Sequence, residues 1–377
     1  MLSAHELGYE KRVNYDPFFF IGLMIIPKSV LHTDTSFHQL LQEVSFSQYL
    51  NPTNSNRAKQ LFLSGTGVPP FIYKPLTQAD SLLKRLDQLI CKEEHTAAEL
   101  LNEKIRRVQT FIVALRDRTE KAFDALNTIE HWYPCADLMN IEIPEEHTSY
   151  EAAQLSAETL IEYLHKALKQ RKMKEWRIVK DVIMSARILV DGSKCVIRIK
   201  PSAQFRKTDL IRLVVHEIDV HAVRSQNGHK QMLKCFATGL PNSMQTEEGL
   251  AMVAERKRGV HIRGTLKQQK WVIWGILKGK KLGFRELYKA LCEHCHADLA
   301  WGICQRIKRG LSHPDLPGVY AKDSVYLSGW YSVNNWLSQG GNIHDLYVGK
   351  VSIHDPVQEW IEEGWVHPQP VPSFWTQ

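Results

Sequence analysis

The sequence predicts a mostly helical α+β fold, and three observations support this class. Apolar residues recur at three- and four-residue spacing through residues 77–126 and again near 149–170, which is the period of amphipathic helices. Residues 176–200 are rich in β-branched side chains and contain Asp191-Gly192, a strong hairpin signal. A strongly apolar helix is predicted to begin at about Leu210. We therefore expect a helical N-terminal layer, a small antiparallel sheet and a buried helix.

Composition favours one integrated domain over residues 1–377. Hydrophobic residues make up 44% and charged residues 24%, as in an ordinary globular protein, so no long stretch is expected to be disordered. No repeat, low-complexity tract or clear linker divides the chain. We expect residues 1–170 to form the mainly helical part and residues 171–377 to hold the sheet and the remaining helices.

Charge and cysteine content restrict the partners and the compartment. The net charge of +7 is dispersed, and the basic clusters at 169–174 and 278–281 lack interleaved aromatic residues, so we expect no nucleic-acid partner. Seven scattered cysteines indicate a reducing compartment. Residues 1–15 are polar, and the apolar run 18–26 is too short to cross a bilayer. A cytoplasmic, monomeric protein without a membrane span is therefore expected.

The elements are expected in the following order. A turn at residues 51–54 leads into a helix over 55–62, and a glycine- and proline-containing loop follows over 64–70. Helices occupy most of 77–126, and a further helix runs from an N-cap at Ser149, with Glu151 in its first turn, to Gln170. Strands are expected at 176–183, 187–190 and 195–199. Residues 284–292 form an amphipathic helix, and we interpret the C-x-x-C-H string at 292–296 as its end rather than as a haem or zinc site.

The helix that begins near Leu210 carries His216, Glu217 and His221, a combination typical of metal-assisted hydrolysis. Imidazole nitrogens bind zinc, and a neighbouring glutamate can take a proton from an activated water. The histidines are five residues apart, however, so at about 100° per residue they would lie about 140° apart on a regular helix. A π-turn inserts one residue and recurs at functional sites. We therefore predict a π-type turn, or a helix end, between His216 and His221.

A catalytic zinc site needs a third protein ligand, and Glu248 is the best candidate. It lies 27 residues after His221 at the start of another apolar segment, and Gly249 beside it allows close backbone approach. Glu247 is the competing choice. Glu255, seven residues after Glu248 on the same helical face, is expected to support a histidine by accepting its second ring proton.

These residues resemble the motifs of the tyrosine carboxypeptidase family of zinc peptidases. That family includes the microtubule-associated enzymes that remove the C-terminal tyrosine of α-tubulin, and bacterial relatives with a Gln-Glu-Gly-Leu-Ala motif. The resemblance covers about residues 50–340 and rests on several segments: His216-Glu217-Ile218-x-x-His221, Arg224, Asn227-Gly228, Glu247-Glu248-Gly249-Leu250-Ala251, Leu50-Asn51-Pro52, Pro69-Pro70-Phe71-Ile72-Tyr73 and Lys322-Asp323-Ser324-Val325-Tyr326-Leu327-x-Gly329.

The resemblance implies one Zn²⁺ held by His216, His221 and Glu248, with Glu217 as the catalytic base, in a peptidase that removes a C-terminal aromatic residue. Two departures bear on the substrate more than on the metal. Glu247 stands where the bacterial relatives have glutamine, and Asp219-Val220 replaces the expected Gly-Thr pair.

A carboxypeptidase must also hold the free terminal carboxylate, which arginine and lysine do well. Arg224, Arg263 and Lys322 are the candidates, with a structural role for Arg224 as the alternative. Tyr326 is the candidate donor to the oxyanion of the tetrahedral intermediate. Trp330, Tyr331 and Trp336 either line an aromatic pocket or belong to the core.

The sequence therefore predicts zinc-dependent hydrolysis of a C-terminal peptide bond before Tyr or Phe, with an acidic peptide or protein tail as a suitable substrate. A zinc endopeptidase with the same site is one alternative. A non-catalytic binding or regulatory protein with a metal site is the other, although a purely structural site has no need of Glu217 as a base.

Overall fold

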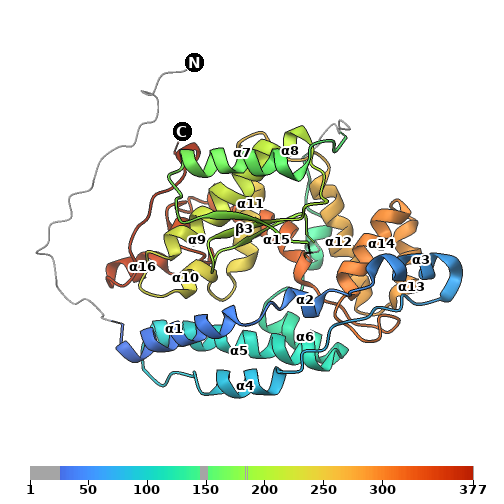
Figure 1. Cartoon of the computed structure of the whole chain (residues 1–377), viewed down its shortest axis with the longest axis horizontal. Coiled ribbons are helices and arrows are strands. Elements are labelled where there is room, and N and C mark those ends of the chain that lie inside the picture. Colours follow the sequence, from blue (N-terminus) through green and yellow to red (C-terminus); the bar gives the residue numbers. More distant parts are fainter. Residues whose placement is uncertain (1–25, 145–151, 183, 185, 377) are drawn as a thin grey trace, which may run out of the picture.

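The computed structural model describes residues 26–144, 152–182, 184 and 186–376. The described part is mostly helical with one three-stranded sheet, which confirms the predicted fold class. In Figure 1 most of the blue and cyan N-terminal helices form a layer along one side, and α7 (Ala157–Gln170) and α8 (Lys207–Leu213) lie across the sheet from that layer. Residues 18–25 of the apolar run, Ser149 and Glu151 lie outside the described residues. None of the helices found in the described ranges has the length and apolar character needed to span a membrane.

The N-terminal part follows the predicted helical pattern, and two of its helix starts have side-chain caps. The His95 ring accepts a hydrogen bond from the amide of Ala97, and the Thr119 hydroxyl accepts one from the amide of Ala122. Arg118 has a left-handed backbone (φ 55°) and separates the two helices on either side of it. The elements of residues 26–144 are α1 (Lys28–Gln42), α2 (Ser47–Leu50), α3 (Ser55–Leu61), η1 (Phe62–Thr66), α4 (Ala79–Asp87), α5 (Thr96–Asp117), α6 (Glu120–Ile129) and η2 (Ala136–Met139).

Helix α7 (Ala157–Gln170) starts later than predicted. Residues 152–156 are not helical, and the Ser156 hydroxyl accepts a hydrogen bond from the amide of Thr159, so Ser156 is the N-cap in place of Ser149. Several Ser and Thr residues precede this apolar stripe, and local chemistry alone does not choose among them.

The sheet is mixed, which corrects the expectation of an entirely antiparallel one. Strands β2 (Ile188–Asp191) and β3 (Val196–Ile199) form the antiparallel hairpin predicted at Asp191-Gly192. Strand β1 (Arg177–Lys180) pairs with β3 in parallel, on the side of β3 that faces away from β2, so the strand order is β1-β3-β2. The most apolar and most buried strand, β3, thereby occupies the centre, and strand order of this kind leaves no mark in local periodicity.

The helix after the sheet contains the predicted π-type turn. Helix α8 (Lys207–Leu213) continues as the π-helix η3 (Val214–Ala222) and then as α9 (Val223–Gly228). Further along the chain lie α10 (Cys235–Thr238), α11 (Ser243–Lys257), α12 (Thr265–Gly279), α13 (Phe284–Cys292), α14 (Ala297–Lys308), η4 (Lys322–Ser324), α15 (Val325–Ser338), η5 (Asp345–Tyr347), α16 (Val357–Glu362) and η6 (Ser373–Trp375).

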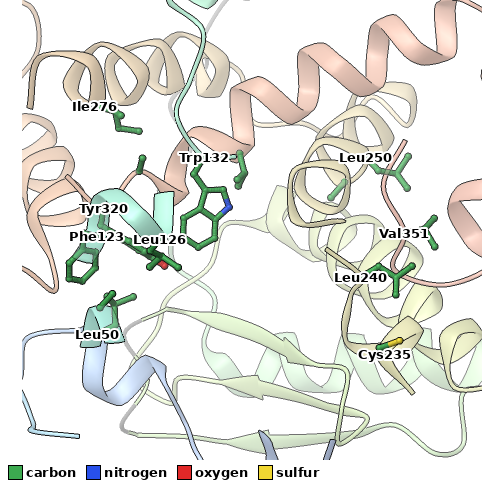
Figure 2. Packing of buried hydrophobic residues seen from close by; sticks show 14 of the residues in the cluster. Leu50, Phe123, Leu126, Trp132, Cys235, Leu240, Leu250, Ile276, Tyr320 and Val351 are labelled. Atoms are coloured by element: carbon green, nitrogen blue, oxygen red, sulfur yellow. The ribbon is translucent and has the colours of Figure 1, made fainter. Parts of the chain in front are cut away.

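Two groups of buried apolar residues stabilise the fold, and η3 contributes to both. The larger group joins the N-terminal layer to α11–α16, and Figure 2 shows part of it around Trp132 and Leu250. The smaller group lies between α7, the sheet and α8. Within η3, Val215 and Val220 belong to the larger group. Its side chains in the smaller group are Val214, Ile218 and Ala222.

Helices α11 and α15 cross with their backbones in contact. A Cβ atom added at Gly249 would collide with the backbone of Gly329, and one added at Gly329 would collide with the carbonyl of Gln245. Only glycine permits this approach. The crossing brings Glu248, next to Gly249, and Tyr326, one turn before Gly329, to the same region of the molecule.

Candidate metal centre

The structure brings His216, His221 and Glu248 together. One ligand atom of each lies within 4.8 Å of the others, and this is the one group of three or more such residues found within the described ranges. Oε2 of Glu248 is 3.7 Å from Nε2 of both histidines. Three ligands around a tetrahedral zinc, each about 2.0–2.1 Å from the ion, would be about 3.4 Å apart, so this donor set fits zinc with little movement.

The π-helix explains how histidines five residues apart serve one site. The widened turn brings the two imidazoles together, with ring centroids 4.7 Å apart and planes nearly perpendicular at 87°. Glu217 lies between them in the chain and is buried. Its negative charge acts on the imidazole of His216, so a potential general base lies close to the candidate ligands.

Each histidine donates a hydrogen bond from its second nitrogen, Nδ1, to a buried carboxylate, which fixes the ring. Nδ1 of His216 is 2.7 Å from Oε1 of Glu255, and Nδ1 of His221 is 2.7 Å from Oε1 of Glu247. Carboxylate–histidine pairs of this kind orient metal ligands and raise their basicity. Burial alone would lower the pKa of His216, but the neighbouring carboxylates of Glu248 and Glu255 raise it to about 10. This electron-rich setting suits a cation.

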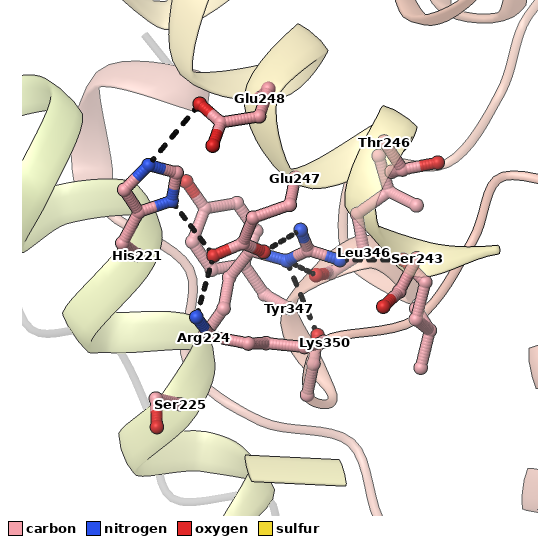
Figure 3. Close-up of polar contacts among 12 residues, drawn as sticks. His221, Arg224, Ser225, Ser243, Thr246, Glu247, Glu248, Leu346, Tyr347 and Lys350 are labelled. Atoms are coloured by element: carbon pink, nitrogen blue, oxygen red, sulfur yellow. Dashed lines mark hydrogen bonds and ion pairs between the residues drawn. The ribbon is translucent and has the colours of Figure 1, made fainter. Parts of the chain in front are cut away.

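Glu247 connects His221 to a buried cationic network, as Figure 3 shows. Its carboxylate forms ion pairs with the guanidinium of Arg224 and, at 2.9 Å, with Nζ of Lys350. Burial would raise the pKa of Glu247, but Lys350, Arg224 and His221 hold it well below its usual range. The competing ligand Glu247 thus faces the far side of the His221 ring from Glu248.

Arg224 does not lie where a substrate could reach it. Its side chain is fully buried, and its guanidinium donates to the carbonyls of Leu346, Gly349 and Val351 as well as to Glu247. The structural alternative for Arg224 therefore replaces the prediction that it binds the substrate carboxylate. Its position three residues after His221 indicated that it lies near the site, but not which way its side chain points.

Asp219, which departs from the expected family motif, points away from the metal ligands. Its carboxylate pairs with the guanidinium of Arg171 at the end of α7, with a distance of 2.9 Å from Nη2 to Oδ2. The Tyr347 hydroxyl donates to its backbone carbonyl. This residue therefore ties η3 to α7 instead of entering the site.

Lys322 and Tyr326 lie on the side of Glu248 formed by η4 and α15. The negative charge of Glu248, together with burial, raises the pKa of the Tyr326 hydroxyl. Burial lowers the pKa of the Lys322 ammonium, against the attraction of Glu248. Both groups are partly accessible, as groups that meet a substrate must be.

The other residues predicted to bind substrate are not part of the group of candidate ligands found in the described part of the chain. Arg263 is exposed in the turn before α12, and its substrate-binding role stays a prediction. Trp330 is buried under the guanidinium of Arg256, and Trp336 packs on Gly341, so these two belong to the core. Tyr331 is 40% exposed. A cavity of about 270 Å³ near the start of α11 is lined by residues such as Gln245 and Ser332, and none of the predicted site residues lines it.

Two arginines beside the site were missed by sequence reasoning. Arg306 and Arg309, in and just after the last turn of α14, both bind the buried carboxylate of Asp323. The Tyr326 hydroxyl is among the groups that raise the pKa of Arg306. They precede the Lys322–Tyr326 motif by more than ten residues on an ordinary amphipathic helix. Their three-residue spacing, which places both on one side of a helix, was the one sequence feature that could have indicated a shared role.

Comparison with known proteins gives two findings. The sequence profile of the family described as microtubule-associated tyrosine carboxypeptidase matches residues 67–377. Proteins named microtubule-associated tyrosine carboxypeptidase 1 are also similar: the Homo sapiens and Rattus norvegicus proteins are 30% identical over 161 residues and the Mus musculus protein 29%. The match covers 41% of this chain and 33% of each relative, so it spans about a third of the relatives' length.

Proposed function

Because this chain belongs to the family of microtubule-associated tyrosine carboxypeptidases, we propose that it is a zinc-dependent carboxypeptidase that removes a C-terminal aromatic residue, tyrosine above all. Family membership supports the class of reaction. The observation that carries the metal assignment is the convergence of His216, His221 and Glu248 with Glu217 beside them. The proposal includes one Zn²⁺ per chain at these three ligands.

The residues of the chain divide the chemistry between them. Zinc bound by the three ligands would supply Lewis-acid activation of water and of the scissile carbonyl. Glu217 takes the proton of the attacking water and passes it to the leaving amine nitrogen, as the new C–O bond forms and the C–N bond breaks. The Tyr326 hydroxyl donates to the oxyanion that develops on the carbonyl oxygen. Lys322 attracts the terminal carboxylate.

An acidic protein tail that ends in tyrosine is the substrate we favour. The net charge of +7 and the cationic side of the site both suit such a tail. The names of the relatives associate them with microtubules, and we extend that association to this chain as part of the proposal. The two departures from the expected motif, Glu247 and Asp219, are engaged by His221 and Arg171.

The first experiment compares wild type with Glu217→Gln on a peptide ending in Tyr. The variant removes the proton acceptor but none of the three predicted ligands, so zinc content should stay at about one per chain. Turnover should fall by about 10²- to 10⁴-fold, the usual contribution of general base catalysis. Zinc content by atomic emission and product release by chromatography are the two measurements.

A matched variant, Glu162→Gln, changes an exposed glutamate on α7 and should leave both readings unchanged. Full turnover by zinc-loaded Glu217→Gln would exclude Glu217 as the base. A wild type that takes up no zinc would exclude the peptidase itself and restore the non-catalytic alternative.

A further inference from the structure

A cluster of three cations around one carboxylate borders the candidate metal centre. Nε of Arg306 is 2.6 Å from Oδ2 of Asp323, and Nη2 of Arg309 is 3.2 Å from Oδ1 of the same carboxylate. Lys322 precedes Asp323 in the turn η4, and the positive charges of both arginines act on its ammonium group. Three cations face the carboxylates of Asp323 and Glu248, so an excess of positive charge remains that an anion from outside can neutralise.

Some hydrogen-bond donors of the cluster have no partner among the described residues. About half of the Arg306 side chain is accessible (48%), whereas Asp323 is buried (5%). Within the part of the chain that the structure describes, no hydrogen bond or ion pair engages the ammonium of Lys322. Nε of Arg309 is buried and has no partner among the described residues. An unpaired cation in a partly buried place is costly unless a ligand completes it.

The cluster adjoins the reaction centre through η4 and the start of α15. Glu248 and Arg306 both act electrostatically on the Tyr326 hydroxyl, and the charge of Glu248 also acts on Lys322. Tyr326 thus lies under the influence of both the predicted metal ligand Glu248 and the accessible guanidinium of Arg306. The carbonyl carbon that reacts beside Glu248 belongs to the penultimate residue of the substrate, so the α-carboxylate of the terminal residue lies one residue further along the chain.

We propose that Arg306 and Lys322 together bind the α-carboxylate of the substrate's last residue and so confine the enzyme to chain ends. The planar guanidinium supplies directed donors and the lysine a point charge. Asp323 and Arg309 are positioning residues, because Asp323 fixes the plane of Arg306 and Arg309 holds Asp323 from the other side. This inference rests on the proposed carboxypeptidase function.

Binding can test the anchor without turnover. In the Glu217→Gln background, isothermal titration calorimetry would compare one acidic peptide ending in Tyr as the free acid and as the C-terminal amide. We expect the acid to bind more tightly than the amide. Arg306→Gln should weaken binding of the acid by about 10- to 100-fold, as expected for a charge-assisted hydrogen bond, and leave binding of the amide unchanged.

Two further variants guard against loss of fold and against a general charge effect. Arg306→Lys keeps the partner of Asp323 and the charge but loses the planar fork, so it should recover part of the affinity for the acid. Lys59→Gln removes the same charge near the other end of α14, where Lys59 pairs with Asp298 at 2.6 Å, and should bind both peptides as before.

The outcomes separate the two hypotheses. Equal binding of acid and amide by the parent protein, or an unchanged acid preference in Arg306→Gln, would overturn the anchor even if the wild type hydrolyses the peptide. A carboxylate preference that depends on Arg306, in a wild type that never hydrolyses the acid, would support the anchor and overturn the proposed reaction.

Discussion

Glu247 and Glu248 are neighbours in the chain, yet their carboxylates meet opposite nitrogens of one imidazole. Oε1 of Glu247 is 2.7 Å from Nδ1 of His221, and Oε2 of Glu248 is 3.7 Å from Nε2 of the same ring. Successive residues of a helix point about 100° apart, so two neighbouring residues of α11 can contact both nitrogens of the ring. Glu248 thus faces the metal position while Glu247 orients the ligand.

This division of roles predicts that Glu247→Gln will weaken zinc binding without abolishing it. The neutral amide accepts a weaker hydrogen bond from Nδ1, and Arg224 and Lys350 lose their buried counter-charge. Loss of a carboxylate behind a metal ligand lowers metal affinity by about 10- to 100-fold. Glu248→Gln, which removes a ligand, should have the larger effect. Competition with a chelator at fixed pH measures both, and the reverse ranking would make Glu247 the ligand.

At the level of single residues, the sequence predicted what depends on short-range spacing. The five-residue interval between His216 and His221 could not fit a regular helix, so a π-turn followed from geometry alone. Arg224 and Arg306 show the limit of such reasoning. Arg224 was expected in the site because it follows His221 closely, but it is buried, whereas Arg306, which binds Asp323 next to Lys322, comes from a helix more than 80 residues further along the chain.

At the level of elements, the crossing of α11 and α15 positions the site. The contact between Gly249 and Gly329 lets the helices approach until Glu248 and Tyr326 share one region. Neither glycine is needed for a special backbone angle, since both lie inside helices. The sequence marked both positions through the family resemblance, but their contact is a tertiary fact, as is the parallel pairing of β1 with β3.

Gly329→Ala should therefore disturb both stability and activity. The added methyl group meets the carbonyl of Gln245, a backbone group that cannot rotate away, and overpacking of this kind costs about 1–3 kcal/mol. Gly302→Ala is the matched control: it lies inside α14 with nothing within 4 Å of its added Cβ, so helix propensity should leave stability equal or up to about 1 kcal/mol higher. Urea unfolding of the metal-free proteins gives the two values, and equal effects would refute the crossing as a tight contact.

At the level of the whole molecule, η3 is shared by the two buried apolar groups, and the predicted metal ligands extend from it to α11. Val215 and Val220 join the larger group while Ile218 joins the smaller one, so movement of η3 disturbs both. Asp219 adds a polar tie to α7 through Arg171. A π-turn forms fewer favourable contacts than a regular helix and persists where surrounding packing holds it. Packing from both sides of η3 supplies that support.

Metal removal should consequently lower the stability of the entire fold. Zinc bound to His216 and His221 on η3 and to Glu248 on α11 would link two elements that are far apart in the unfolded chain. A ligand that binds only the folded state at about 1,000 times its dissociation constant adds about 4 kcal/mol to the free energy of unfolding. Thermal unfolding with zinc and with a chelator should thus differ for wild type and for Glu217→Gln, but not for His221→Ala. Because Glu217→Gln keeps every ligand, a stabilisation that disappeared in this variant would place the metal on Glu217 and contradict the assignment of the base.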